Sequence, residues 1–114
     1  MWEKFHCAIE VFEPQIWAVE RLTKRFKGLE KVHVRPYGLW LNDAQLQMGD
    51  YYTDGASILK PANPNDPVCE FKSLYQELLG EEVDVMLMNV EGAEYHLIPA
   101  LIHSRLIGNV RHFW

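Results

Sequence analysis

One run of eight residues, VDVMLMNV at positions 83–90, constrains the fold of this chain more than any other segment. Six of the eight residues are apolar, so a strand made from them has little polar surface to offer solvent on either side. Nearly continuous apolar runs are typical of strands that are buried on both faces of a parallel sheet. Because helices must cover both faces of such a sheet, the run predicts an α/β fold.

A second apolar segment, residues 8–13, predicts another buried strand that leads into a helix. Pro14 suits the first turn of that helix, because proline lacks the N–H that would be unpaired there. Apolar residues then recur at helical spacing, and Gly28 marks the end of the helix. The same spacing predicts two further helices, residues 71–79, which end at Gly80, and residues 92–104, with a distortion at Pro99.

Shorter segments complete the pattern. Alternating apolar and polar residues predict a strand at 31–36, and another strand begins at residue 110. Residues 38–50 predict a short hairpin, and the three prolines of residues 60–67 predict a surface loop. Strands therefore alternate with helices along most of the chain, and we expect a mostly parallel sheet with flanking helices.

Composition limits the classes of function. A chain of 114 residues is one domain or part of one, and 48% hydrophobic residues suffice for a core. The net charge of −5 disfavours a nucleic-acid partner, which needs a basic surface, and no apolar run is long enough to span a membrane. Cys7 and Cys69 are expected to be small apolar residues, with a disulfide as the alternative. Two thiols and no signal peptide indicate a reducing compartment, so we expect a cytoplasmic protein.

Two acids stand where the two apolar segments end. Glu13 follows the first segment and Glu91 follows the second. Ligands of open parallel sheets bind beyond the carboxyl ends of the strands, so we expect both carboxylates to face one crevice. Asn89 lies two residues before Glu91, and strand alternation would place both side chains on the same side, where they could orient one polar ligand group.

Each acid has a functional and a structural interpretation. A carboxylate such as that of Glu13 can accept hydrogen bonds from both hydroxyls of a ribose, because it offers two acceptor oxygens in one plane. Glu13 could equally cap the following helix, where negative charge is favourable, and spacing alone does not separate the two roles. Glu91 could likewise lie at the start of the next helix, or could accept a hydrogen bond from a cofactor or substrate, with Gly92 allowing close approach.

A metal-dependent hydrolase that uses Glu91 and Glu94 is a third possibility. The spacing of Asp84, Glu91 and Glu94 does not match a recognisable set of metal ligands. We therefore expect no metal site in this chain.

Two motifs together resemble a known family. VFEP at 11–14, followed by an amphipathic helix, resembles the second-strand motif of FkbM-type methyltransferases. VDVMLMNVEGAEYHLI at 83–98 resembles the later motif of that family, an apolar strand followed by Asp or Asn, a hydrophobic residue and Glu-Gly-Ala/Gly-Glu. RPYGL and DGAS fall where the family has its third strand and a small-residue loop, so the resemblance covers about residues 9–114.

This resemblance implies an S-adenosylmethionine-dependent methyltransferase with a partial Rossmann-like fold, acting on a hydroxyl oxygen of a small-molecule or glycan-type acceptor. Carried over by position, Glu13 binds the ribose hydroxyls, and the stretch Tyr37, Gly38 and Leu39 lies near the adenine. Asn89 and Glu91 lie by the reacting methyl group and the acceptor. Two positions depart from the family, since Leu87 replaces a frequent Lys, and Asn89, where Asp is frequent, cannot be a carboxylate base.

The family pattern also predicts that residues 1–114 are a single truncated domain. Such folds open with a strand and a Gly-rich turn that receives the methionine end of the cofactor, whereas residues 1–7 contain no glycine. In the family topology the missing strand lies between the strands at 8–13 and 83–90. These two strands must then pair directly, pair with another chain or leave backbone groups unsatisfied, at about 1–3 kcal/mol per buried group. A second function stays open, a non-catalytic α/β module that self-associates or binds a protein partner through open sheet edges.

Overall fold

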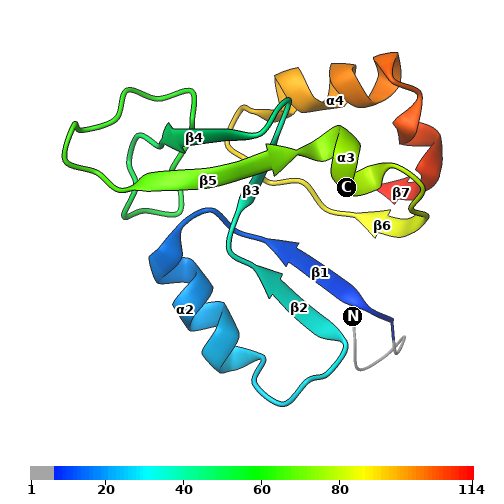
Figure 1. The fold of residues 1–114 in the computed structure, drawn as a ribbon, viewed down its shortest axis with the longest axis horizontal. Helices are drawn as coiled ribbons and strands as arrows, with labels where there is room; N and C mark the ends of the chain where they lie inside the picture. Colours follow the sequence, from blue (N-terminus) through cyan, green and yellow to red (C-terminus); the bar gives the residue numbers. More distant parts are fainter. Residues whose placement is uncertain (1–6) are drawn as a thin grey trace.

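The computed structural model describes residues 7–114, which form small β-sheets with helices packed against them (Figure 1). The mixed α/β class expected from the sequence is confirmed. Predictions made for residues 1–6 lie outside the described residues. The strands are β1 Ile9–Phe12, β2 Val32–Arg35, β3 Gly38–Trp40, β4 Ala44–Gln47, β5 Val68–Ser73, β6 Val83–Met86 and β7 Val110–Phe113. The helices are α2 Ile16–Arg25, α3 Leu74–Leu78, α4 Glu94–His103 and the 3-10 helix η1 Leu106–Asn109.

The first unit, β1–α2–β2, has the three elements that the sequence predicts, but no residue of β1 is buried, so the expectation of a buried strand at 8–13 is wrong. β1 and β2 pair in parallel, with Ile9 opposite Val32. Gln15 is the N-cap of α2, so Pro14 stands just before the helix rather than in its first turn. Gly28 follows the helix with a φ of 88°, a backbone conformation that glycine adopts without a steric penalty. None of the residues of α2 is buried, so the helix covers β1 and β2 only partly.

The second unit, β6–α4–β7, is also parallel, with Val83 opposite Val110. β6 ends at Met86, and the expectation of a strand over 83–90 that is buried on both faces is wrong. Met86 and Met88 pack against the core beneath α4, whereas Leu87 points the other way and is 67% exposed. Among the described residues, β7 is the single strand neighbour of β6, and helices cover one face of this pair, which explains the exposure.

The middle of the chain differs from the prediction in two places. β3 and β4 do not form a hairpin, because β5 lies between them and pairs with both, parallel to β3 and antiparallel to β4. The predicted helix over 71–79 is shorter, since residues up to Ser73 belong to β5 and α3 follows. In β5 the side chains of Cys69, Phe71 and Ser73 are buried in alternation, and this two-residue period outweighs the helical spacing. The Ser73 hydroxyl then caps α3 by accepting a hydrogen bond from the Gln76 N–H.

The buried core lies around the β3–β5–β4 sheet and under α4. One cluster joins α3, α4 and η1, and its buried members are Leu74, Leu78, Ala93, Leu97, Leu101 and Leu106. The other cluster lies against β5, and its buried members are Met48, Tyr51, Ala56, Cys69 and Phe71. Trp40 and Ile58 pack against both clusters, so the two form one continuous interior. α4 continues through Pro99, and no helix among residues 7–114 is long and apolar enough to cross a membrane.

Within residues 7–114 the strands form three separate sheets, with the orders β1-β2, β3-β5-β4 and β6-β7, and not the single sheet that we expected. Three of the four pairings are parallel, as expected for most of the strands. In Figure 1, β1 and β6 are the inner strands of their two pairs and run towards the same side of the molecule. They do not pair with each other, so the direct pairing considered for a missing central strand does not occur.

Candidate functional site

Glu13 follows β1 directly, and its carboxylate is half-buried beneath the first turn of α2. Its Oε1 accepts a hydrogen bond from the Gln15 N–H at 2.9 Å. Burial raises the pKa of Glu13, and the Gln15 bond lowers it by less. Burial, followed by the nearby charge of Glu13, raises the pKa of the Cys69 thiol to about 11. The carboxylate therefore lies near β5 in a partly dry setting, where one oxygen supports the helix cap.

The raised pKa of Glu13 gives stability a definite dependence on pH. Between the ordinary value of 4.5 and its raised value, the folded state holds this proton more tightly than the unfolded state, so stability falls as pH rises. We expect Glu13→Gln, which keeps an acceptor for the Gln15 N–H, to stabilise the protein at pH 7 and to have little effect below pH 4. Urea unfolding at both pH values measures this difference.

Glu10 is the matched control for that experiment because its pKa is shifted the other way. Burial raises the pKa of Glu10, but the hydrogen bonds and charges of Arg35 and His33 outweigh it and hold the pKa below its usual value. Glu10→Gln should therefore destabilise the protein more at pH 7 than at pH 3. A Glu13→Gln variant that is less stable than the native chain at pH 7 would show that the Glu13 carboxylate is not penalised by burial.

A cluster of hydrogen bonds beside Glu13, which we call the polar hub, joins residues 15–17 at the start of α2 to residues 51–53 in the loop after β4. The Gln15 side chain is buried and donates hydrogen bonds to the carbonyls of Tyr51 and Thr53. The Trp17 indole N–H donates to the Tyr51 carbonyl at 3.0 Å, and the Tyr51 hydroxyl accepts from the Ile16 N–H at 3.1 Å. No local sequence pattern indicates this role of Tyr51, because its partners Ile16 and Trp17 lie 35 and 34 residues away in the chain. The hub fixes the chain that follows β1 against the loop after β4, and so sets the place of Glu13.

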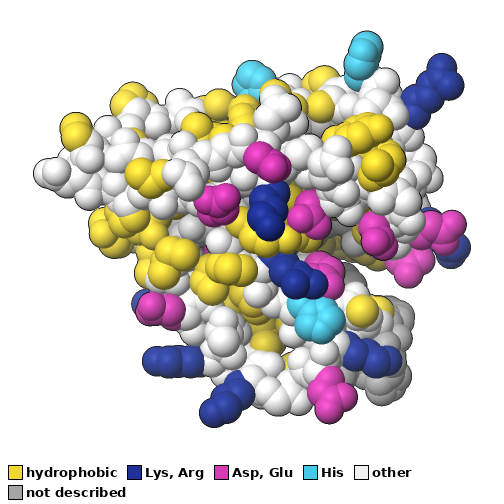
Figure 2. All heavy atoms as spheres, viewed as in Figure 1, with side chains coloured by type: hydrophobic (Ala, Val, Ile, Leu, Met, Phe, Trp, Pro, Cys, Tyr) yellow, Lys and Arg dark blue, Asp and Glu magenta, His cyan; other side chains and the backbone are white. Residues whose placement is uncertain are grey.

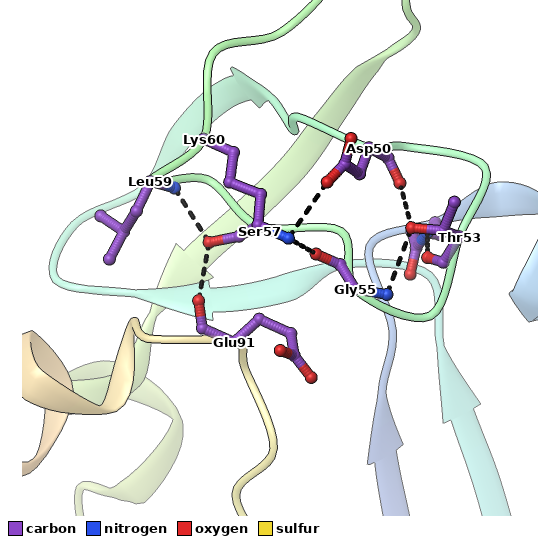
Figure 3. Close-up of polar contacts among 8 residues, drawn as sticks. Asp50, Thr53, Gly55, Ser57, Leu59, Lys60 and Glu91 are labelled. Atoms are coloured by element: carbon purple, nitrogen blue, oxygen red, sulfur yellow. Dashed lines mark hydrogen bonds and ion pairs between the residues drawn. The ribbon is translucent and has the colours of Figure 1, made fainter.

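Glu91 lies in a strained loop between β6 and α4. Its φ of 49° is left-handed, as is that of Gly92 at 97°, and a non-glycine residue there costs about 1–2 kcal/mol. The Ser57 hydroxyl donates a hydrogen bond to the Glu91 carbonyl at 2.8 Å and accepts one from the Leu59 N–H at 3.1 Å (Figure 3). The exposed carboxylate of Glu91 points away from Ser57 (Figure 3). Its backbone is therefore held tightly while its side chain stays accessible.

Glu94 has a structural role in the same loop. Its carboxylate accepts hydrogen bonds from the Val90 N–H at 3.0 Å and the Gly92 N–H at 2.7 Å. Burial acts to raise the pKa of Glu94, but these backbone bonds outweigh it and the pKa is lowered. The carboxylate is thus used to fold the loop before α4. In residues 7–114 no group of three or more His, Cys, Asp or Glu side chains could hold a metal ion.

The strain at Glu91 predicts a stabilising substitution. Glu91→Gly should raise the free energy of unfolding by about 0.5–1 kcal/mol, because it removes the left-handed penalty and glycine gives back part of that gain through unfolded-state entropy. The carbonyl that Ser57 binds is unchanged. Arg105 has a φ of 64° and is also exposed, so Arg105→Gly is a matched control with a similar gain. Chemical denaturation measures both, and a loss of stability at position 91 alone would mean that its side chain supports the loop.

Asn89 lies at the surface, whereas residues 37–39 contact other parts of the protein. Asn89 is exposed, but the strand alternation that paired it with Glu91 is wrong, because β6 ends at Met86. The Tyr37 hydroxyl donates to Glu77 Oε1 at 2.9 Å, and its ring contacts Phe12.

Gly38 and Leu39 are used in packing. A Cβ on Gly38 would lie 2.5 Å from a ring atom of Phe71, so this glycine permits close contact inside the protein. Leu39 packs against the core under α4. Tyr37 and Leu39 are both half-buried, and the Lys72 ammonium lies over the Tyr37 ring, 4.4 Å from its centroid.

Comparisons with known proteins add no relative to these observations. A scan against protein-family models finds no match, and searches of curated proteins and of solved structures find no similar chain.

Proposed function

We propose that this chain is part of an S-adenosylmethionine-dependent methyltransferase of the FkbM type, with a partial Rossmann-like fold. One observation carries the proposal: two parallel βαβ units run towards the same side of the molecule, and each has an acid in the loop that follows its first strand. Ligands of parallel α/β sheets bind in such loops. The sequence motifs around Glu13 and Glu91 are those that resemble the family.

The surroundings of Glu13 suit a carboxylate that binds the two hydroxyls of a ribose. One carboxylate oxygen is held by the Gln15 N–H, which orients the group, and partial burial strengthens any hydrogen bond that it makes. A bound diol would replace lost hydration with charge-assisted hydrogen bonds. The ring of Tyr37 is the proposed contact for adenine.

Glu91 and Asn89 are the proposed contacts for the methyl acceptor. S-adenosylmethionine supplies an electrophilic methyl group, and the protein contributes mainly by holding an acceptor hydroxyl in line with it. The exposed Glu91 carboxylate can accept the proton of that hydroxyl, and its strained, fixed backbone limits how far the side chain moves. Asn89 can orient the acceptor by donating a hydrogen bond.

Isothermal titration with S-adenosylmethionine tests this proposal. We expect Glu13→Gln to weaken cofactor binding about tenfold or more, the effect of losing one charge-assisted hydrogen bond. Glu20→Gln, an exposed substitution on α2, should leave the affinity unchanged. Absence of both heat and thermal shift at millimolar cofactor would reject cofactor binding by this chain.

The second candidate is a non-catalytic module that binds a protein through its sheet edges. The observation in its favour is that β1 and β6 each have one strand neighbour in the described part of the chain. A chain that associates through these edges and has no affinity for the cofactor would favour this function. A monomer with cofactor affinity would favour the methyltransferase.

A further inference from the structure

α4 has a second apolar face, which points away from the core. Its inner face carries Leu97 and Leu101, which are buried in the cluster that joins α3, α4 and η1. Three further apolar side chains, Tyr95, Ile98 and Ile102, follow one another at intervals of three and four residues, so they share one face of the helix. Among the described residues, none of these three belongs to a core cluster. A helix that is apolar on several faces is typical of one that packs on more than one side.

The outer face of α4, formed by Tyr95, Ile98, Pro99 and Ile102, is accessible. Tyr95 is 84% exposed and Ile102 is 57% exposed. Tyr95, Ile98 and Pro99, together with Glu94, line an open hollow on this face. In Figure 1, α4 lies along the outer edge of the molecule, and Figure 2 shows hydrophobic and histidine side chains along that edge.

The spacing of these residues favours another helix as the occupant. Apolar residues that are three and four apart form the seam between paired helices, in which a side chain of one helix inserts among four residues of the other. Tyr95, Ile98, Pro99 and Ile102 lie at positions i, i+3, i+4 and i+7, which is such a set of four. The hollow therefore has the arrangement that receives a side chain from a facing helix.

The charges at the two ends of α4 favour a second copy of this chain as that occupant. Glu91 and Glu94 lie at the N-terminal end, and Arg105 follows the C-terminal end. Within residues 7–114 neither the Glu91 carboxylate nor the Arg105 guanidinium forms an ion pair. The same helix turned end to end places the acids of each copy beside the arginine of the other, and antiparallel pairing also brings opposite ends of the two helix dipoles together.

The order of the apolar residues agrees with the order of the charges. If α4 meets its reversed copy at a two-fold axis between Ile98 and Pro99, Tyr95 of each copy lies opposite Ile102 of the other. The acidic end of each helix then lies beside the arginine of the other copy. Each contact occurs twice, as a two-fold interface requires.

We propose that the outer face of α4 binds the same face of a second copy of this chain, as an antiparallel pair of helices. α4 has 10 residues and is therefore about 15 Å long, so the interface is small and belongs to the weak, transient class. We expect a Kd on the order of 100 μM. The chain is then a monomer at the low micromolar concentrations of an unfolding experiment. No strand edge takes part, and this inference does not depend on cofactor binding.

Sedimentation equilibrium from micromolar to millimolar concentrations of the chain tests the proposal. Ile102→Glu should weaken the dimer by about tenfold or more, because it places a charge in the apolar contact. Leu87→Glu is the matched control, since Leu87 is 67% exposed on the side of the β6–β7 pair that faces away from α4, and it should leave the Kd unchanged. A monomer at millimolar concentration would overturn the proposal. A dimer that Leu87→Glu weakens and Ile102→Glu does not would also overturn it.

A charge exchange tests the antiparallel direction. Glu91→Lys and Arg105→Glu each bring like charges together at both ends of the dimer, so each variant alone should dimerise about three- to tenfold more weakly than the native chain. An equal mixture of the two variants has opposite charges at both ends, and its heterodimer should have the native Kd. This recovery cannot arise from misfolding. A mixture that associates no better than its components, or one that associates more tightly than the native chain, as a parallel pair would, contradicts the proposed arrangement.

Discussion

Replacing Tyr51 with alanine should destabilise this protein by about 3–5 kcal/mol, the range for removing a large buried aromatic side chain. Tyr51 is 3% exposed and belongs to the core cluster that lies against β5. Its hydroxyl accepts a hydrogen bond from the Ile16 N–H, which the substitution leaves without that partner at the start of α2. Urea unfolding followed by tryptophan fluorescence measures the loss, because the Trp17 indole is bonded to the Tyr51 carbonyl.

The adjacent tyrosine is an internal control for this prediction. Tyr52 is 69% exposed and touches Tyr51 edge to face, with ring centroids 4.8 Å apart. Tyr52→Ala should cost about 0.5–1.5 kcal/mol, the value of such an aromatic pair. Tyr51→Phe removes only the hydroxyl and should cost a similar amount. If Tyr51→Ala cost no more than Tyr52→Ala, the Tyr51 side chain would not be packed in the core cluster as the structure has it.

The elements that the sequence predicts correctly are those whose pattern is local. In β1, α2 and β2 the spacing of apolar residues changes clearly from that of a strand to that of a helix and back. Gly28 ends the helix at the expected place. β5 was missed because Phe71 fits a helical spacing with the residues of α3 and also a two-residue spacing with Cys69. The decision between them depends on β3 and β4, which flank β5 from other parts of the chain, and a local pattern does not contain that information.

The positions of the two acids after their strands were predictable from the sequence, but the backbone around Glu91 was not. The acids at positions 13 and 91 do stand in the loops after two parallel strands. The Glu91 carbonyl, in a left-handed stretch of backbone, accepts a hydrogen bond from the Ser57 hydroxyl, 34 residues away in sequence, and no spacing rule could supply that contact. The carboxylate of Glu94 completes the same loop from within four residues, a local contact that the Glu-Gly-Ala-Glu motif could have suggested.

Leu97→Ala should be the second large loss, at about 2–5 kcal/mol. Leu97 is 1% exposed and lies at the centre of the cluster that joins α3, α4 and η1. The substitution leaves a cavity that α4 cannot close by moving, because Ala93 and Leu101 hold the helix against the core on either side of it. The cost therefore exceeds the transfer free energy of the lost methyl groups.

Ile102, on the same helix, is the control that distinguishes the loss of a buried side chain from a change in helix propensity. Ile102 is 57% exposed, and alanine is the better helix former, so Ile102→Ala should change the free energy of unfolding by less than about 1 kcal/mol. Comparable losses at positions 97 and 102 would mean that α4 does not pack as the structure has it. Met86 and Met88 pack on the same cluster as Leu97. A large loss at Leu97 alone, with amide hydrogen exchange accelerated in β6 as well as in α4, would therefore show that the helices on one face of β6 hold that strand in place.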